Sequence, residues 1–284
     1  MGSAQRLDTL NAEVYTSMEI LTILLSGLLA LVSPAGLVID RVIANNLRSR
    51  FDKVEQLQVR VDNAPSYQIV QGKVERVRIA GRGLWVTPDV RLDMLELETD
   101  PINLDIQRLR GGGQQAARDS LRQPVQAGLH VALTESDLNK ALESPAVKNR
   151  LRLIFSRFLG GSPERYEIVN PKVAFLDNKR LRFHVELREK DAEPLALVLE
   201  SGLGVVAGRS IQLIEPTVLV NGKPLSPTLA AGLTRGLSNR LDLRKLEEAG
   251  IIARLLQLNV QPGALDVAAF VRVDPSKQKS TPTP

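Results

Sequence analysis

Several stretches of the chain alternate between apolar and polar residues, which is the pattern of a β-strand with one buried face. The clearest is 180–188, where every second residue is Leu, Phe or Val and the residues between them are charged or His. The same period appears in 56–62, 73–80 and 265–273. Strands of this kind, joined by tight turns such as Asn221-Gly222, predict antiparallel sheets with one solvated face.

One predicted strand changes its apolar phase along its length. In 91–100 the apolar positions are first Leu92 and Met94 and then Leu95 and Leu97. A phase change of this kind predicts a bulge, which bends a strand and curves the sheet around it.

The best helix signal begins at Thr134, which is followed three residues later by Asp137 in the manner of a capping box. An apolar stripe continues from there through Leu138, Leu142 and Phe155, and Ser144-Pro145 is predicted to kink or restart the helix. Shorter helices are predicted over 225–240 and 243–256.

An uncharged segment of 20 residues, from Ile20 to Ile39, reaches about 30 Å as one helix, the thickness of a bilayer core. Ser33-Pro34 has the pattern of an N-cap followed by Pro at the first helical position, so a new helix is able to start there. Three interpretations fit the segment 18–39: a retained anchor, a cleaved secretory signal, or a helix packed on the folded domain. Residues 1–17 and 275–284 are predicted to be a disordered extension and a disordered tail.

Composition narrows the function classes. Aromatic residues make up only 4% of the 284 residues, so Leu, Val and Ile must fill the interior, a surface that suits alkyl chains better than bases. The net charge of +5 weakly favours anionic partners such as phosphate headgroups. With no Cys and only two His, thiol and His-based chemistry have little support.

Motifs for catalysis are not apparent in the sequence. The glycines of Gly81-Arg82-Gly83 and 111–113 lack the strand and helix context of a phosphate loop, and no Ser lies in a GxSxG elbow. The acidic residues of 93–100 are most simply a solvated strand face. We therefore predict a protein that is not an enzyme and that has no cofactor and no metal site.

A basic group near one strand end has two interpretations. Arg76, Arg78 and Arg82 are candidates for contact with headgroups or a membrane surface, or they keep an outer face soluble. Nucleic acid is disfavoured as a partner because no outward aromatic residues lie between the basic ones.

Three runs of sequence resemble the LmeA-like phospholipid-binding family, in particular its cyanobacterial members. They are VEQLQVRVDNAPSYQIVQGKVERVRIAGRGLWV, LELETDPINLD and LTESDLNKAL, and the resemblance extends over about 38–273. It implies a fold like that of the tubular lipid-binding proteins, in which a curved antiparallel sheet wraps a long helix and an acyl chain lies between them.

The resemblance and the pattern together predict an α+β protein with curved antiparallel sheets around a long helix and an N-terminal apolar helix. One lipid-binding domain is expected over 40–274, with a possible joint near 110–126. The expected function is to hold or carry an acyl chain of a membrane phospholipid in an aliphatic groove between helix and sheet, at a cell-envelope or thylakoid membrane. The residues predicted to line the groove are Leu138, Leu142, Phe155, Phe183, Val185, Leu187, Leu197 and Leu199.

Two alternatives remain open at this point. The first is a structural or interaction protein of the envelope whose core is closed and holds no ligand. The second is an envelope hydrolase, which requires polar groups that converge from separate elements. The pattern does not identify the lipid, the side of the membrane or any protein partner.

Overall fold

The computed structural model describes residues 44–275 with the exception of 46, 64–67, 69–70, 110–117, 160–161 and 190–192. The predicted anchor or signal over 18–39, the extension 1–17 and the tail beyond Pro275 lie outside the described residues, as does most of the first half of the possible joint at 110–126.

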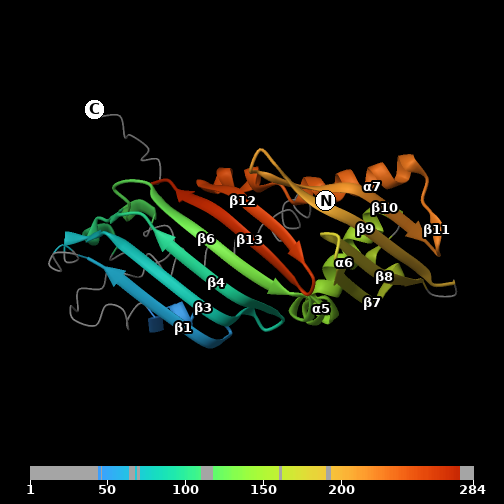
Figure 1. The fold of residues 1–284 in the computed structure, drawn as a ribbon, viewed down its shortest axis with the longest axis horizontal. Helices are drawn as coiled ribbons and strands as arrows, with labels where there is room; N and C mark the ends of the chain where they lie inside the picture. The colour runs from blue at the N-terminus through green and yellow to red at the C-terminus, as the bar shows by residue number, and fades with distance from the viewer. Residues whose placement is uncertain are drawn as a thin grey trace.

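Two antiparallel sheets make up most of the molecule and lie side by side along its long axis (Figure 1). The first sheet has six strands, in the order β1 (Lys53–Asp62), β3 (Arg76–Thr87), β4 (Val90–Thr99), β6 (Val125–Thr134), β13 (Ala264–Val273) and β12 (Ile251–Gln261). The second sheet has five strands, in the order β11 (Lys223–Pro224), β10 (Ser210–Val220), β9 (Leu195–Val206), β8 (Arg180–Glu189) and β7 (Tyr166–Phe175). A small pair joins β2 (Lys73–Val74) to β5 (Ile102–Asn103).

The helices are short and lie between or beside the sheets. They are α3 (Ile106–Leu109), α5 (Glu135–Glu143), α6 (Pro145–Leu159) and α7 (Pro227–Arg240), with 3-10 turns η2 (Pro163–Arg165) and η3 (Leu243–Ala249). In Figure 1, α5 and α6 lie at the junction of the two sheets and α7 runs along the second sheet. The structure confirms an α+β protein built mainly from antiparallel sheet.

The helix predicted from Thr134 begins and breaks where the sequence indicates. The backbone N–H of Asp137 donates to the Thr134 hydroxyl at 3.0 Å, which caps α5. Ser144 ends α5 in an extended conformation and Pro145 starts α6. The described part of the chain holds no helix longer than the 15 residues of α6, so the long helix expected from the resemblance is not seen there.

An apolar row crosses the first sheet from one edge to the other. The strand registers align Val59, Ile79, Leu97, Leu129, Ala269 and Leu255 in that order. A cluster of buried apolar residues, called the first core here, gathers on this face and includes Ile79 and Leu97. Leu47 and Phe51 from the segment that precedes β1, and Leu246 from η3, also belong to it. Alternation in each strand therefore predicts which face is buried.

A third cluster joins the two sheets and is called the third core here. It contains Val173, Phe175 and Val260, with Leu138, Leu142, Leu181, Leu203 and Leu265 packed against it. A backbone hydrogen bond of 2.7 Å from Leu255 to Gly208 also ties the edge of the first sheet to the β9–β10 turn. The sheets therefore share an apolar contact and a polar one.

Some elements differ from those predicted. Residues 251–256 belong to β12 and not to a helix, because Gly250 takes a left-handed φ of 70° and ends η3. Gly81 and Gly83, which follow the predicted strand 73–80, lie inside the longer strand β3, where Gly83 has a φ of 56°. β4 buries both Leu92 and Leu95, but its register with β3 is continuous between them, so the bulge predicted within 91–100 is wrong. The register shift of this pair lies in β3, between Trp85 and Thr87.

A buried carboxylate ties the start of α5 to the first sheet. The Asp137 side chain is only 5% exposed and accepts hydrogen bonds from Arg91 Nη1 at 2.6 Å and from the Thr134 hydroxyl at 2.7 Å. Burial acts to lower the pKa of Arg91, but its hydrogen bonds to Asp137, Glu55 and Asp93 outweigh this effect and raise that pKa above its usual value.

We predict that Arg91→Ala lowers the free energy of unfolding by about 3 kcal/mol, because it leaves the Asp137 carboxylate buried without its cation. Arg60→Ala is the matched control, since Arg60 is 71% exposed in its pair with Asp62 and such pairs contribute less than about 1 kcal/mol. Urea denaturation of both variants provides the comparison. Equal, small losses would mean that Asp137 does not depend on Arg91.

Candidate functional site

Most of the residues predicted to line a groove come together in one place. Phe155 of α6, Phe183, Val185 and Leu187 of β8, and Leu197 and Leu199 of β9 all belong to the second core, with Ile168, Val218 and Leu233. Leu138 and Leu142 lie apart from them, in the third core.

Strand register explains why the second core forms. Val185 lies opposite Leu197 and Phe183 lies opposite Leu199, so these side chains share one face of the second sheet. Phe155 of α6 and Leu233 of α7 pack over that face. Val185 is 0% exposed, and the helices therefore enclose this apolar surface.

A hollow of 1070 Å³ lies over the middle of the first sheet and is called the sheet hollow here. Ala44, Asn45 and Arg48 form one wall. Because Leu47 of the same segment packs into the first core, this wall lies against the apolar face of the sheet. The apolar lining consists of Leu57, Val59, Ile79, Leu97, Leu129, Ala269 and Leu256.

Parts of that apolar lining are not fully covered. Val59 and Leu129 are only partly buried where they pack against the first core. Leu256 lies at the bulge between Leu255 and Gln257 of β12 and is 69% exposed. The sheet hollow thus offers apolar surface that the described chain itself does not fill.

Charged groups also line the sheet hollow. They are Arg48, Arg60, Arg78, His130, Glu96 and Glu98. Arg78 forms ion pairs with Asp62 at 2.7 Å and with Glu98 at 3.7 Å, and His130 lies 3.6 Å from Glu96 and 3.5 Å from Asp266. Each of the charged strand residues in this lining is the direct neighbour of an apolar-row residue, as Arg60 is of Val59 and Arg78 is of Ile79, so its side chain points to the opposite face of the first sheet. Arg48 instead belongs to the segment that packs on the apolar face.

The predicted basic group divides between two environments. Arg78 lines the sheet hollow, whereas Arg76 forms a 3.2 Å ion pair with Glu98 and Arg82 is exposed further along β3. Their alternate positions on one strand were visible in the sequence. The sequence did not indicate that Arg48 and Arg60 approach the same hollow, because they come from different elements.

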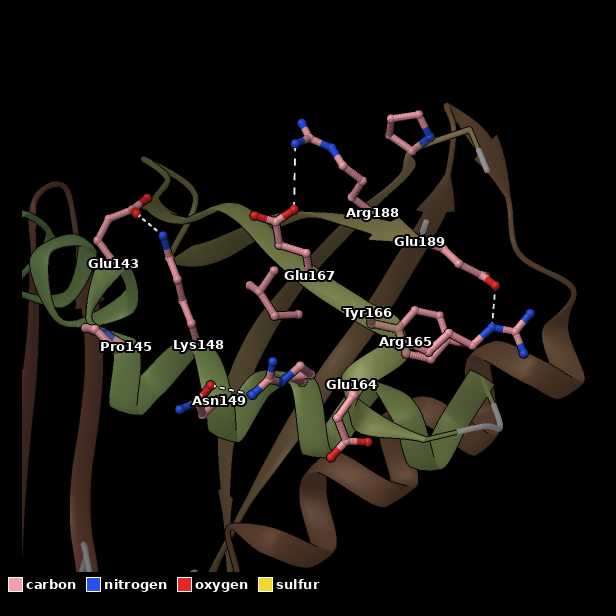
Figure 2. Close-up of a pocket in the computed structure, with 13 residues that line it drawn as sticks. Glu143, Pro145, Lys148, Asn149, Glu164, Arg165, Tyr166, Glu167, Arg188 and Glu189 are labelled. Carbon is pink, nitrogen blue, oxygen red and sulfur yellow. Dashed lines mark hydrogen bonds and ion pairs between the residues drawn. The ribbon is translucent and has the colours of Figure 1, made fainter. Parts of the chain in front are cut away.

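A second hollow, of 820 Å³, lies between α6 and the strands β7 and β8 and is called the α6 hollow here. Figure 2 shows three ion pairs around it, which join Lys148 to Glu143, Arg188 to Glu167, and Arg165 to Glu189. The hydrogen bond to Glu189 raises the pKa of Arg165. Tyr166 and Ile168 are buried and provide the apolar part of its lining.

Metal sites and membrane-spanning helices are both absent from the described residues. No group of three His, Asp or Glu side chains there is arranged to hold a metal ion. None of the helices there combines the length and the hydropathy needed to cross a bilayer.

Comparison with known proteins adds one finding. The model of the LmeA-like phospholipid-binding family matches residues 31–270. Neither the curated proteins nor the solved structures contain a significant match to the chain.

We predict that Phe155→Ala lowers the free energy of unfolding by about 3 kcal/mol, because the enclosed second core is left with a cavity. Leu153→Ala, two residues away on α6 and 39% exposed, should cost less than about 1 kcal/mol. Thermal or urea unfolding measures both. A small loss for Phe155→Ala would instead show that the second core is loosely packed and has room for a ligand.

Proposed function

Because the chain belongs to the LmeA-like phospholipid-binding family, we propose that it binds a membrane phospholipid and holds an acyl chain in the sheet hollow, between the first sheet and the segment around Ala44 and Arg48. The observation that carries the proposal is the partial exposure of Val59 and Leu129 in the apolar row, together with the exposed Leu256 at the β12 bulge, in a hollow of 1070 Å³. Small-molecule pockets typically enclose roughly 300 to 1,000 Å³, so the space is sufficient.

Binding of this kind needs no reacting group. Each methylene that the lining removes from water contributes about 0.8 kcal/mol, and a long chain accumulates a large favourable free energy. The lining is branched and aliphatic, as the low aromatic content of the chain requires. We therefore propose a binding role and not a catalytic one.

The cations of the sheet hollow suit the other end of the lipid. Arg48 belongs to the wall over the apolar row, and Arg60 and Arg78 contribute to the lining from the opposite face of the first sheet. A guanidinium group binds phosphate oxygens through charge-assisted hydrogen bonds. We propose that the phosphate lies at this basic side while the acyl chain lies along the apolar row.

The proposed place of action is a membrane. The segment 18–39, whose residues from Ile20 to Ile39 carry no charge, is long enough to anchor the chain, and we propose that it does so at the cell envelope or thylakoid membrane of a cyanobacterial-type host. The overall net charge of +5 is compatible with an anionic surface.

One observation favours the rival function of a structural protein with a closed core. The second core, where most groove residues were predicted, is enclosed by α6 and α7. On this alternative the sheet hollow is a surface depression that holds no ligand. The two functions differ in whether lipid remains with the protein during purification.

We expect native mass spectrometry of the full chain, purified gently in a mild detergent, to show an adduct with the mass of one phospholipid. Extraction and lipid analysis then identify the adduct. Bare protein that also fails to bind phospholipid vesicles would favour the structural alternative.

We also expect Leu256→Asn to weaken phospholipid binding about fivefold, because it removes roughly 1 kcal/mol of apolar contact at the sheet hollow. Leu229→Asn is the matched control, since Leu229 of α7 is similarly exposed, at 63%, and lies outside the hollow. Binding of a fluorescent phospholipid to both variants measures the difference. Equal effects of the two substitutions would contradict the proposed position of the acyl chain.

A further inference from the structure

The α6 hollow is lined by equal numbers of basic and acidic side chains, and none of them lines the proposed acyl-chain site. Its lining includes four basic side chains, Lys148, Arg152, Arg165 and Arg188, and four acidic ones, Glu143, Glu164, Glu167 and Glu189. They come from α5, α6, η2, β7 and β8, so the arrangement depends on the fold and not on a local charge run.

Most of these charges neutralise one another in pairs. Lys148 contacts Glu143 at 2.5 Å, and Arg188 lies 3.7 Å from Glu167. Arg165 donates to Glu189. These pairs leave Arg152 and Glu164 as the charged groups to which no ion pair is assigned within the described residues.

The Arg152 guanidinium is held in place by one hydrogen bond, but another of its N–H groups has no hydrogen-bond partner within the described residues. Its Nη2 donates to the Asn149 side chain at 2.7 Å, which fixes the guanidinium on the surface of α6. Its Nε is buried and has no hydrogen-bond partner in the part of the chain that the structure describes. A buried, charged N–H without an acceptor is destabilising, so a ligand that supplies an oxygen there binds favourably.

The chemistry of the ligand follows from the surrounding groups. Phosphate oxygens match a guanidinium well. However, the carboxylates around the hollow oppose a ligand that is only anionic. Glu164 accepts a hydrogen bond from the Ser162 hydroxyl and is exposed, so it remains able to receive a cation.

We propose that the α6 hollow binds the headgroup of a zwitterionic phospholipid, with the phosphate on Arg152 and the ammonium group at Glu164. Tyr166 and Ile168 provide the apolar contact beside the headgroup, and Ile168 continues into the second core. This inference rests on the proposed phospholipid binding and adds to it a second site, separate from the sheet hollow, for the headgroup of another lipid molecule.

The test is a titration of the full chain, in a maltoside detergent, with two short-chain lipids that differ only in the headgroup. Dihexanoyl phosphatidylethanolamine should bind more tightly than dihexanoyl phosphatidylglycerol. Arg152→Gln should weaken binding of the ethanolamine lipid about tenfold, the effect of one lost charge-assisted hydrogen bond. Arg235→Gln, which removes the same charge from the exposed side of α7, should leave binding unchanged.

Two further variants test the roles of the individual groups. Arg152→Lys keeps the charge without the planar fork and should give an intermediate affinity. Glu164→Gln should reduce the preference for the ethanolamine lipid over the glycerol lipid several-fold. Circular dichroism of each variant checks that the fold is retained, which is expected because both side chains lie at a solvent-accessible hollow.

The outcomes separate this inference from the broader function. If both lipids bind and Arg152→Gln changes neither affinity, the headgroup assignment is overturned while phospholipid binding stands. If neither lipid binds, both proposals fail. If O-phosphoethanolamine, which has no acyl chains, binds as tightly as dihexanoyl phosphatidylethanolamine, the ligand of the hollow is a soluble phosphate ester. That result would overturn the assignment to a lipid.

Discussion

Pairing between β6 and β13 holds the molecule together. The two strands align along their whole length, from Val125 opposite Val273 to Thr134 opposite Ala264. Between them in the chain lie α5, α6, the second sheet and α7. Because the chain leaves the first sheet at the end of β6 and returns through β12 and β13, this ladder fixes both ends of the second sheet. Such a contact, distant in sequence, closes a long loop and is entropically costly until it forms.

That closure determines which apolar surfaces are covered. The second sheet is covered by α6 and α7, so Val185 and its neighbours are removed from water completely. The apolar row of the first sheet is covered less completely, and it remains partly exposed at Val59 of the edge strand β1 and at Leu129 of β6. The enclosed face contributes to stability, whereas the partly open one still has apolar surface to bury. A ligand gains most where the protein has not already made the contact.

Local patterns predicted the elements that depend on local physics. Alternation identified the face of β8, and the Thr134 cap and the Ser144-Pro145 break set the ends of α5. The start of β12 was predicted to be part of a helix over 243–256. The adjacent Leu255 and Leu256 at the bulge interrupt the alternation that would have indicated a strand. The sheet hollow was not predictable in this way, because its lining comes from strands that are neighbours only after the C-terminal hairpin returns. The candidate groove was placed on the clearest strand, whose apolar face proved to be covered by α6 and α7.

The two hollows differ in how freely their cations reach a phosphate. In the sheet hollow, Arg78 is shared between Asp62 and Glu98, and exposed pairs of this kind are worth little, so a phosphate displaces them at small cost. The same weakness makes them poor at discriminating one headgroup from another. Within the described residues, both Arg78 and Arg152 have a buried Nε–H without a hydrogen-bond partner, but Arg152 is fixed by Asn149 and no ion pair there competes for it, so the benefit of binding in the α6 hollow depends on where the acceptor lies. General attraction to phosphate and selection of a headgroup therefore belong to different parts of the molecule.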